Sequence, residues 1–216
     1  FLKDFFKSRR FDVVHTHSSK AGIVGRFAGK FAGTPFIVHT VHGLAFHRYE
    51  KAWKNLVYKV SERLASKCCD RIYAVAGAMI DQCVAAKVAP RGKFKVVYSG
   101  MELEPFLNAK PDPALRRSLG IPDERPVVGT LARLFPLKGY EQFIPAAIKV
   151  ARMRPDVHFL IVGDGAMRAE LEETVRACGL ASSFSFAGLV APSEVHRYIA
   201  MMDMLSHLSL REGLPR

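Results

Sequence analysis

The sequence predicts an α/β protein whose parallel strands carry helices on both faces. Short apolar segments of strand type alternate with segments of helical spacing from residue 11 onwards. Several of the strand-type segments run directly into a loop with glycine or polar residues. Hydrophobic residues make up 49% of the chain and charged residues 24%, which is typical of a globular protein with a real core. With 216 residues, the chain has room for one large or two small domains.

The first hundred residues contain four strand-type segments. We expect strands at 11–17, 36–41, 71–75 and 94–98, with helices at 20–32, 48–67 and 77–86 between them. Gly25, Gly29 and Gly33 recur every four residues in the first of these helices, which favours close packing of that helix on a sheet. A Pro-Arg-Gly sequence indicates a linker at 88–93. We therefore expect two domains, at 1–90 and 91–216.

The second half continues the alternation. We expect strands at 127–131, 157–162, 184–186 and 204–208, and helices at 114–119, 143–150, 166–178 and 193–201. Three prolines make 105–113 a soft connecting stretch. Gly163 and Gly165 follow the second of these strands, but Arg168 stands where a GxGxxG dinucleotide fingerprint needs its third glycine. The segment therefore lacks that fingerprint.

The segment VVGTLARLFPLKGYE at 127–141 carries the strongest candidate for a binding site. Its apolar strand ends in a loop with Arg133 and Lys138, and Gly139 precedes the next helix. Ligands of open α/β sheets bind beyond the carboxyl ends of the strands, beside helix N-termini. Arginine offers a planar fork and lysine a mobile point charge, so this pair can hold a phosphate or diphosphate. The same pattern also occurs in ordinary solvated loops.

Charge is distributed unevenly along the chain. Residues 1–100 contain 18 Lys and Arg against 6 Asp and Glu, whereas residues 101–216 contain 14 of each, so the whole net charge of +12 lies in the first half. This asymmetry predicts an acidic partner for the first half: a membrane surface, nucleic acid or an anionic substrate. No aromatic side chains alternate with the basic ones as a stacking platform, which disfavours nucleic acid.

The segment 48–67 predicts a long amphipathic helix. Apolar residues fall on one face and basic residues on the others. The apolar residues are Trp53, Leu56, Val57, Val60 and Leu64, and the basic ones are Arg48, Lys51, Lys54, Lys59, Arg63 and Lys67. Two interpretations stay equally open: an interfacial membrane helix, or a helix that covers a sheet and leaves its lysines in water. No segment approaches the ~18 consecutive apolar residues of a transmembrane helix.

Five histidines cluster in the first half of the chain: His15, His17, His39, His42 and His47. Their spacing matches no known metal site and no carboxylate lies among them, so we expect no metal. His42 directly precedes a glycine at the end of a strand and is the best placed to face a ligand. The four cysteines form no CxxC pair, and we expect free thiols in a reducing cytosol.

Seven segments together resemble the retaining glycosyltransferases of family 4, a group with the GT-B fold. The resemblance runs almost end to end, and it depends on the order and spacing of the segments rather than on any single one. They are DVVHTH at 12–17, VHTVHG at 38–43, VVYSGMELEPF at 96–106, GTLARLFPLKG at 129–139, LIVGDGAMRAEL at 160–171, FAGLV at 186–190 and SLREGLP at 209–215.

The resemblance implies two Rossmann-like domains that face each other across a cleft, with the acceptor on the first and a nucleotide sugar on the second. Arg133 and Lys138 would hold the donor diphosphate. Glu212 would contact the donor sugar as the first member of a Glu-x7-Glu motif, whose second glutamate falls beyond residue 216. His42 matches a first-domain histidine at the reaction centre. Further donor-binding residues implied by the resemblance are Gly129, Leu189, Val190, Gly213 and Leu214.

The expected activity is that of a hexosyltransferase. By resemblance, a sugar moves with retention of configuration from a nucleotide sugar, with UDP preferred, to a lipid-linked or saccharide acceptor in cell-envelope polysaccharide or glycolipid assembly. Arg133 and Lys138 can stabilise the leaving diphosphate without a divalent metal, so we expect no cofactor. The expected location is cytoplasmic, with peripheral attachment to the inner face of the membrane as an option.

Three alternatives remain open at this point. They are a non-catalytic GT-B scaffold, a basic module that binds an anionic membrane surface, and an epimerase or phosphorylase on the same scaffold. The chain starts with Phe1 rather than methionine and stops without a closing element, so we expect an internal piece of a longer protein.

Overall fold

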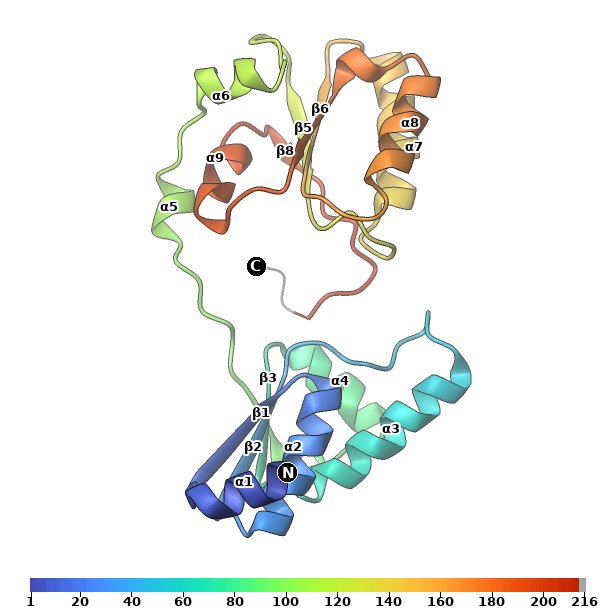
Figure 1. Cartoon of the computed structure of the whole chain (residues 1–216). Helices are drawn as coiled ribbons and strands as arrows, with labels where there is room; N and C mark the ends of the chain where they lie inside the picture. Colours follow the sequence, from blue (N-terminus) through green and yellow to red (C-terminus); the bar gives the residue numbers. More distant parts are fainter. Residues whose placement is uncertain (214–216) are drawn as a thin grey trace. The chain divides into compact units, whose positions relative to one another are not determined.

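The computed structural model describes residues 1–213 and divides them into two compact units. The first unit comprises residues 1–101 together with 212–213, and the second comprises residues 102–211. Each unit contains one four-stranded sheet in which every strand pair is parallel (Figure 1). The predicted α/β class with two Rossmann-like sheets is confirmed.

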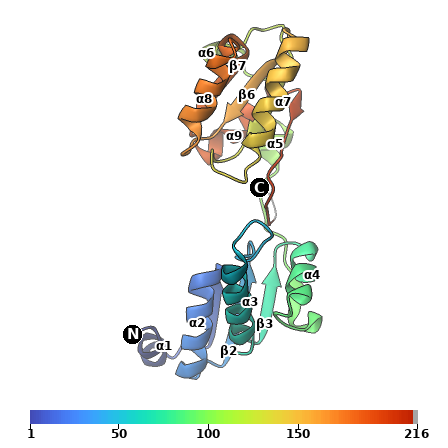
Figure 2. The same cartoon turned by 90° about the vertical axis from the view of Figure 1, so that its right-hand side faces the viewer.

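The first unit is built from four strands and the helices that connect them. Its elements are α1 (Leu2–Arg9), β1 (Val13–His17), α2 (Ser19–Ala32), β2 (Phe36–Val41), α3 (Ala52–Ser66), β3 (Arg71–Ala74), α4 (Gly77–Ala85), a 3-10 turn at Arg91–Lys93 and β4 (Phe94–Val96). The strands pair in the order β1-β2-β3-β4. Because crossovers between parallel neighbours are right-handed, α2, α3 and α4 lie on one face of this sheet (Figure 2).

The end of the first unit differs from the expected domain boundary. β4 pairs with β3, with Ile72 opposite Phe94, so residues 94–96 complete the first sheet. The expected linker at 88–93 is packed against this unit, because the hydroxyl of Ser66 donates to the carbonyl of Val88 over 2.8 Å. The two units divide between residues 101 and 102 rather than after residue 90.

The glycine repeat of α2 lets this helix approach the first sheet closely. A Cβ on Gly25 would lie 2.8 Å from Cγ2 of Thr16, and one on Gly29 would lie 3.1 Å from Cδ1 of Ile37. Gly33 has φ of 77° and forms the left-handed C-cap of the helix. The predicted close packing of this helix on the sheet is confirmed.

The second unit carries helices on both faces of its sheet. Its elements are α5 (Glu104–Leu107), α6 (Pro113–Ser118), β5 (Val127–Leu131), α7 (Tyr140–Met153), β6 (His158–Val162), α8 (Arg168–Ala177), a 3-10 turn at Ala181–Ser183, β7 (Phe184–Gly188), a 3-10 turn at Pro192–Glu194, α9 (Val195–Ile199) and β8 (Met204–Leu205). One hydrophobic core joins α7 and α8 to Phe159 and Ile161 of β6. A second core on the opposite face joins Leu160 and Val162 of β6 to Met201, just after α9.

The strand order of the second sheet creates a switch point. The order is β7-β6-β5-β8, so the chain moves from β5 to one side through β6 and β7, and then returns to the other side of β5 as β8. Open α/β sheets bind ligands beyond the carboxyl ends of the strands at such a reversal. The fold therefore places the candidate site at the ends of β5 and β8. Among residues 1–213, no helix combines the length and apolar character needed to cross a bilayer.

Candidate functional site

Two loops meet at the switch point of the second sheet. The amide of Leu210 donates to the carbonyl of Leu137 over 2.9 Å, which ties the loop after β8 to the loop after β5. Gly139, with φ of 89°, lies so near the loop after β8 that a Cβ would be 2.3 Å from the carbonyl oxygen of Leu208. Only glycine fits there, because both the backbone angle and the contact exclude a side chain.

Buried groups of the second unit hold the loop after β5 in place. The side chain of Leu134 is fully buried, and its amide donates to the carbonyl of Asp164 over 2.9 Å. The hydroxyl of Tyr140 donates to the carbonyl of Ala132 over 2.9 Å, and burial raises the pKa of Tyr140 to about 12. The loop is thus fixed at both ends by the unit's own core.

Arg133 and Lys138 lie on this fixed loop. Arg133 is exposed, and its guanidinium carbon is 5.5 Å from the ring centre of Phe135. Lys138 is half-buried and directly precedes Gly139, the N-cap of the 14-residue helix α7. The N-terminus of such a helix carries a partial positive charge, so two cations and a helix end share one edge of the sheet. This arrangement suits a diphosphate.

The other residues implied for the donor site lie in different surroundings. Gly129 is buried in β5, where a Cβ would lie 2.1 Å from the sulfur of Met202, so packing accounts for this glycine and its contact with the donor stays a prediction. Leu189 is exposed just after β7, and Val190 packs on the second unit's core. The amide of Gly163 donates to the carbonyl of Gly188 over 2.9 Å, which holds the loop with Leu189 at the same sheet edge.

The candidate residues at the end of the chain are only partly described. Glu212 and Gly213 are grouped with the first unit. Within it, Gly213 approaches His42 so closely that a Cβ would lie 2.0 Å from the carbonyl oxygen of His42. Leu214 lies outside the described residues, so its predicted contact with the donor stays a prediction.

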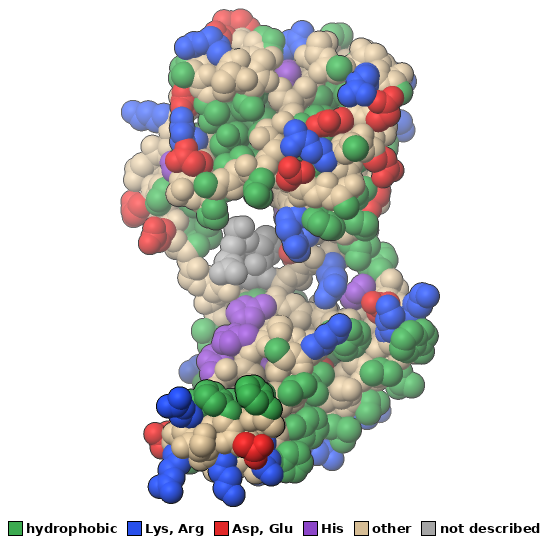
Figure 3. All heavy atoms as spheres, in the orientation of Figure 1, with side chains coloured by type: hydrophobic (Ala, Val, Ile, Leu, Met, Phe, Trp, Pro, Cys, Tyr) green, Lys and Arg blue, Asp and Glu red, His purple; other side chains and the backbone are tan. Residues whose placement is uncertain are grey.

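Three of the five histidines meet on the surface of the first unit, where Figure 3 shows histidine side chains together. A ring nitrogen of His17 lies 2.9 Å from one of His42, so one of the two donates to the other. The rings of His15 and His17 are 4.3 Å apart between centres. Burial and the neighbouring His17 and His42 lower the pKa of His15. The contact with His17 orients the ring of His42, and a fixed ring orientation is what a substrate-facing histidine needs.

His39 differs from its neighbours because it is buried. Its Nδ1 lies 2.9 Å from the hydroxyl of Thr16, and burial together with Arg26 lowers its pKa to about 3, so it is neutral near pH 7. A Cβ on Gly22 would lie 2.4 Å from Cε1 of the His39 ring, which means that the helix packs directly on this ring. His39 is therefore part of the packing of α2 on the sheet. His47 lies away from the strands, where its backbone pairs with the side chain of Asn55.

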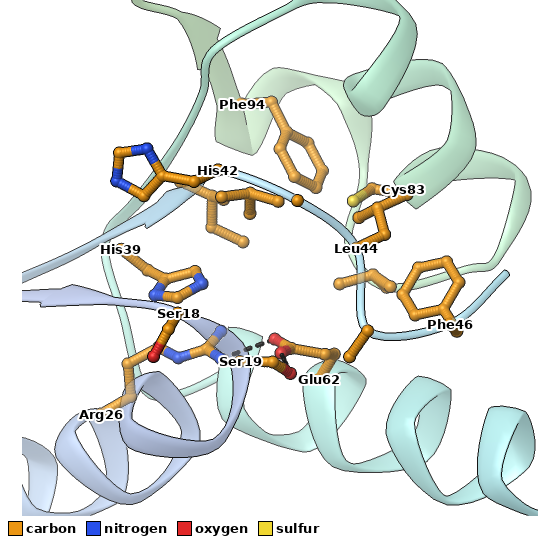
Figure 4. Close-up of a pocket in the computed structure, with 15 residues that line it drawn as sticks. Ser18, Ser19, Arg26, His39, His42, Leu44, Phe46, Glu62, Cys83 and Phe94 are labelled. Atoms are coloured by element: carbon orange, nitrogen blue, oxygen red, sulfur yellow. Dashed lines mark hydrogen bonds and ion pairs between the residues drawn. The ribbon is translucent and has the colours of Figure 1, made fainter. Parts of the chain in front are cut away.

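A small cavity under this histidine surface contains a buried ion pair that the sequence did not reveal. Arg26 and Glu62 approach to 2.6 Å in an environment from which water is almost excluded. The hydroxyl of Ser19 donates to the other oxygen of Glu62 over 2.6 Å, and Nε of Arg26 donates to the carbonyl of Gly22. Figure 4 shows this pair at one side of the cavity, with the ring of His39 next to Arg26 and the ring of His42 farther away. The only signal in the sequence is an arginine inside a glycine-rich helix face.

Metal binding finds no support in the described part of the chain. Residues 1–213 contain no group of three or more His, Cys, Asp or Glu side chains that could hold a metal ion. All four cysteines are free. That the reaction needs no metal stays a prediction.

Two family profiles match nearly the whole chain. A profile described as glycosyl transferase 4-like domain matches residues 2–100, and one described as glycosyl transferases group 1 matches residues 111–216. The two matches follow the two structural units closely, since the second unit begins at residue 102.

Curated relatives of the chain are also glycosyltransferases. The chain is 36% identical over 174 residues to UDP-Gal:alpha-D-GlcNAc-diphosphoundecaprenol alpha-1,3-galactosyltransferase of Escherichia coli, a match that covers 79% of this chain and 45% of the relative. It is 24% identical over 229 residues to alpha-monoglucosyldiacylglycerol synthase of Acholeplasma laidlawii, covering 98% of this chain and 57% of the relative. The chain thus spans about half the length of these relatives.

Solved structures confirm the fold. The protein HepE of Anabaena, crystallised with UDP, matches with a TM-score of 0.77 at 24% identity, over 96% of this chain and 55% of that one. Sucrose-phosphate synthase from Thermosynechococcus elongatus matches with a TM-score of 0.76 at 19% identity, over 99% and 54%. Two matching profiles, sequence relatives and GT-B neighbours agree, and the chain belongs to the group 1 glycosyltransferases of family 4.

Proposed function

We propose that the full-length protein transfers a sugar from a UDP-sugar to a lipid-linked or saccharide acceptor, with retention of configuration. The observation that carries this proposal is the position of Arg133 and Lys138, on a fixed loop at the switch point and beside the N-terminus of α7. The E. coli relative is named for a UDP-Gal donor and a diphosphoundecaprenol-linked acceptor, and HepE was crystallised with UDP, which supports UDP as the nucleotide.

The chemistry explains why cations are needed at this place. When the bond between sugar and diphosphate breaks, negative charge develops on the leaving phosphate oxygen while the sugar ring becomes cation-like. Donors fixed in advance around that oxygen stabilise the transition state more than the ground state. Arg133 supplies a fork of N–H groups and Lys138 a compact charge, so the two match a diphosphate. A glycosidase would instead need two carboxylates that flank the scissile bond.

The first unit takes the acceptor side in this proposal. His42 faces the substrate at the reaction centre, and His17 holds its ring through the 2.9 Å contact. Glu212 contacts the hydroxyls of the donor sugar, and the amides of Gly213 and Leu214 contact the phosphates. We further propose that the protein acts in the cytoplasm, in cell-envelope polysaccharide or glycolipid assembly.

Nucleotide binding tests the proposed donor site. We expect UDP to bind the full-length protein with micromolar affinity in a calorimetric titration, and GDP and ADP to bind at least ~10-fold more weakly. Lys138→Ala should abolish the UDP signal because it removes a charge from the diphosphate site. Lys149→Ala, a change at an exposed lysine near the other end of α7, is the matched control and should leave binding unchanged. If no nucleotide binds, the chain is a non-catalytic scaffold and the proposal is wrong.

A further inference from the structure

Helix α3 turns its apolar face away from the protein. Five side chains at helical spacing form an exposed stripe: Trp53 is 62% exposed, Leu56 63%, Val57 55%, Val60 42% and Leu64 49%. A helix of a globular protein normally places such a stripe on the core and its polar residues in water. α3 does cover one face of the first sheet (Figure 2), as one of the two interpretations expects, but its apolar stripe faces away from that sheet.

The inner face of α3 explains why the stripe cannot turn inward. The buried residues of the helix are Glu62, Ala65 and Ser66, on the side opposite the stripe. Glu62 forms the ion pair with Arg26, and the hydroxyl of Ser66 donates to the carbonyl of Val88. Rotating the helix would leave Arg26 buried without its counter-charge, which costs about 3–5 kcal/mol. The orientation of α3 is therefore fixed by the protein itself.

The charges around the stripe are mostly basic. Arg63 and Lys67 are exposed beside it, Lys51 is exposed at the N-cap of the helix, and Lys54 and Lys59 are half-buried. Between residues 51 and 69 the only carboxylate is Glu62, which is buried and paired. In Figure 3 hydrophobic side chains lie over α3 on the surface of the first unit. Glu50, just before the helix, pairs with Lys54 over 3.4 Å, so the exposed side of this helix combines an apolar stripe with flanks in which basic side chains outnumber acidic ones.

We propose that this face of α3 docks the protein on an anionic lipid bilayer. From Trp53 to Leu64 the stripe is ~16 Å long at 1.5 Å per residue, and a convex helix face of this kind can lie in the headgroup region with its apolar side chains immersed. Tryptophan favours that interface, and lysines beside the stripe would contact anionic headgroups. The proposal does not depend on sugar transfer, since docking needs no nucleotide.

Other occupants fit these observations less well. A second copy of the chain would bring two basic faces together, which like-charge repulsion opposes. A partner peptide is usually bound in a groove, whereas this stripe stands on a convex helix. A small anion would use the lysines but would leave five apolar side chains in water.

Vesicle binding by the full-length protein tests the proposal. We expect sedimentation with vesicles of phosphatidylcholine mixed with phosphatidylglycerol, weaker binding to phosphatidylcholine alone, and weaker binding at high salt. Leu56→Ser/Val60→Ser should weaken vesicle binding at least about tenfold, because two apolar side chains no longer enter the lipid. Lys51→Gln/Lys67→Gln should weaken it about fivefold for each charge removed.

Controls separate docking from misfolding and from other partners. All four positions are exposed, so the variants should unfold at the wild-type midpoint. Leu107→Ser/Met153→Ser removes two exposed apolar side chains of the second unit and should leave vesicle binding unchanged. Absent binding to anionic vesicles, or binding that Leu56→Ser/Val60→Ser leaves intact, would overturn the proposal. The proposal would also be wrong if the protein self-associated, these substitutions abolished that self-association, and no vesicle binding occurred. It would be wrong as well if Trp53 fluorescence were already shielded from acrylamide before vesicles are added.

Discussion

Replacing Arg133 by alanine is expected to lower kcat for sugar transfer by the full-length protein about 100- to 1000-fold, the usual cost of removing one donor to developing oxyanion charge. The guanidinium lies on a loop whose backbone is fixed by the buried side chains of Leu134 and Tyr140. Arg133→Lys should recover only part of the rate, because lysine lacks the planar fork. Product formation from a radiolabelled UDP-sugar measures both variants.

The matched control for this prediction is Arg152→Ala. Arg152 is an exposed arginine of the same unit, in the last turn of α7 and therefore at the opposite end of that helix. Its replacement should leave turnover within the error of the assay. Turnover by Arg133→Ala at the wild-type rate would show that the loop after β5 does not hold the diphosphate.

Glu62→Gln is expected to destabilise the first unit by about 3–5 kcal/mol, the usual cost of removing one partner from a buried ion pair. Arg26 is fully buried, and its only charged partner among the described contacts is Glu62. Urea unfolding of the chain can be followed through Trp53, the only tryptophan in the sequence, which lies in α3, the helix that also contains Glu62.

Two further variants give this experiment its controls. Asp81→Asn breaks an ion pair with Arg91 of the same unit in which both side chains are about two-thirds exposed, so it should change the free energy of unfolding by less than ~1 kcal/mol. Arg26→Met/Glu62→Leu removes both buried charges and should recover most of the loss. A cost below ~1 kcal/mol for Glu62→Gln, or no recovery in the double variant, would mean that the pair does not hold α2 and α3 together.

Much of the fold could be predicted because local patterns and tertiary packing agree. β2 at Phe36–Val41 and β5 at Val127–Leu131 were predicted with their observed bounds, since each is an apolar run between turn signals. The glycine repeat of α2 predicted its close packing. β8 is only Met204–Leu205, shorter than the predicted 204–208, because the following residues form the loop that is tied to Leu137.

The errors have physical causes as well. The Pro-Arg-Gly sequence at 90–92 resembles a linker but forms a 3-10 turn that leads into β4, and strand pairing with β3 overrides the local signal. The apolar stripe of α3 predicted a helix correctly but not which way it faces, because the deciding contact, Arg26 with Glu62, joins residues far apart in the sequence.

The candidate site was predicted in part. The loop with Arg133 and Lys138 could be found from the sequence, since a strand, basic residues and a glycine before a helix are consecutive there. The strand order that makes it a switch point could not, because it depends on where β8 inserts. The sequence indicated His17 and His42 as members of one cluster of five histidines, but the contact between their two rings depends on the pairing of β1 with β2.

In the proposed reaction, the full-length protein transfers a sugar from a UDP-sugar to a separate acceptor. The most direct test is product analysis after incubation with UDP-glucose, UDP-galactose or UDP-N-acetylglucosamine, with and without a polyprenyl-diphosphate-linked sugar as acceptor. We predict that one donor yields free UDP and a glycosylated acceptor, and that this product requires the acceptor. Conversion of the UDP-sugar to an isomer without acceptor, release of a sugar phosphate only when inorganic phosphate is added, or no turnover of any donor would contradict the claim.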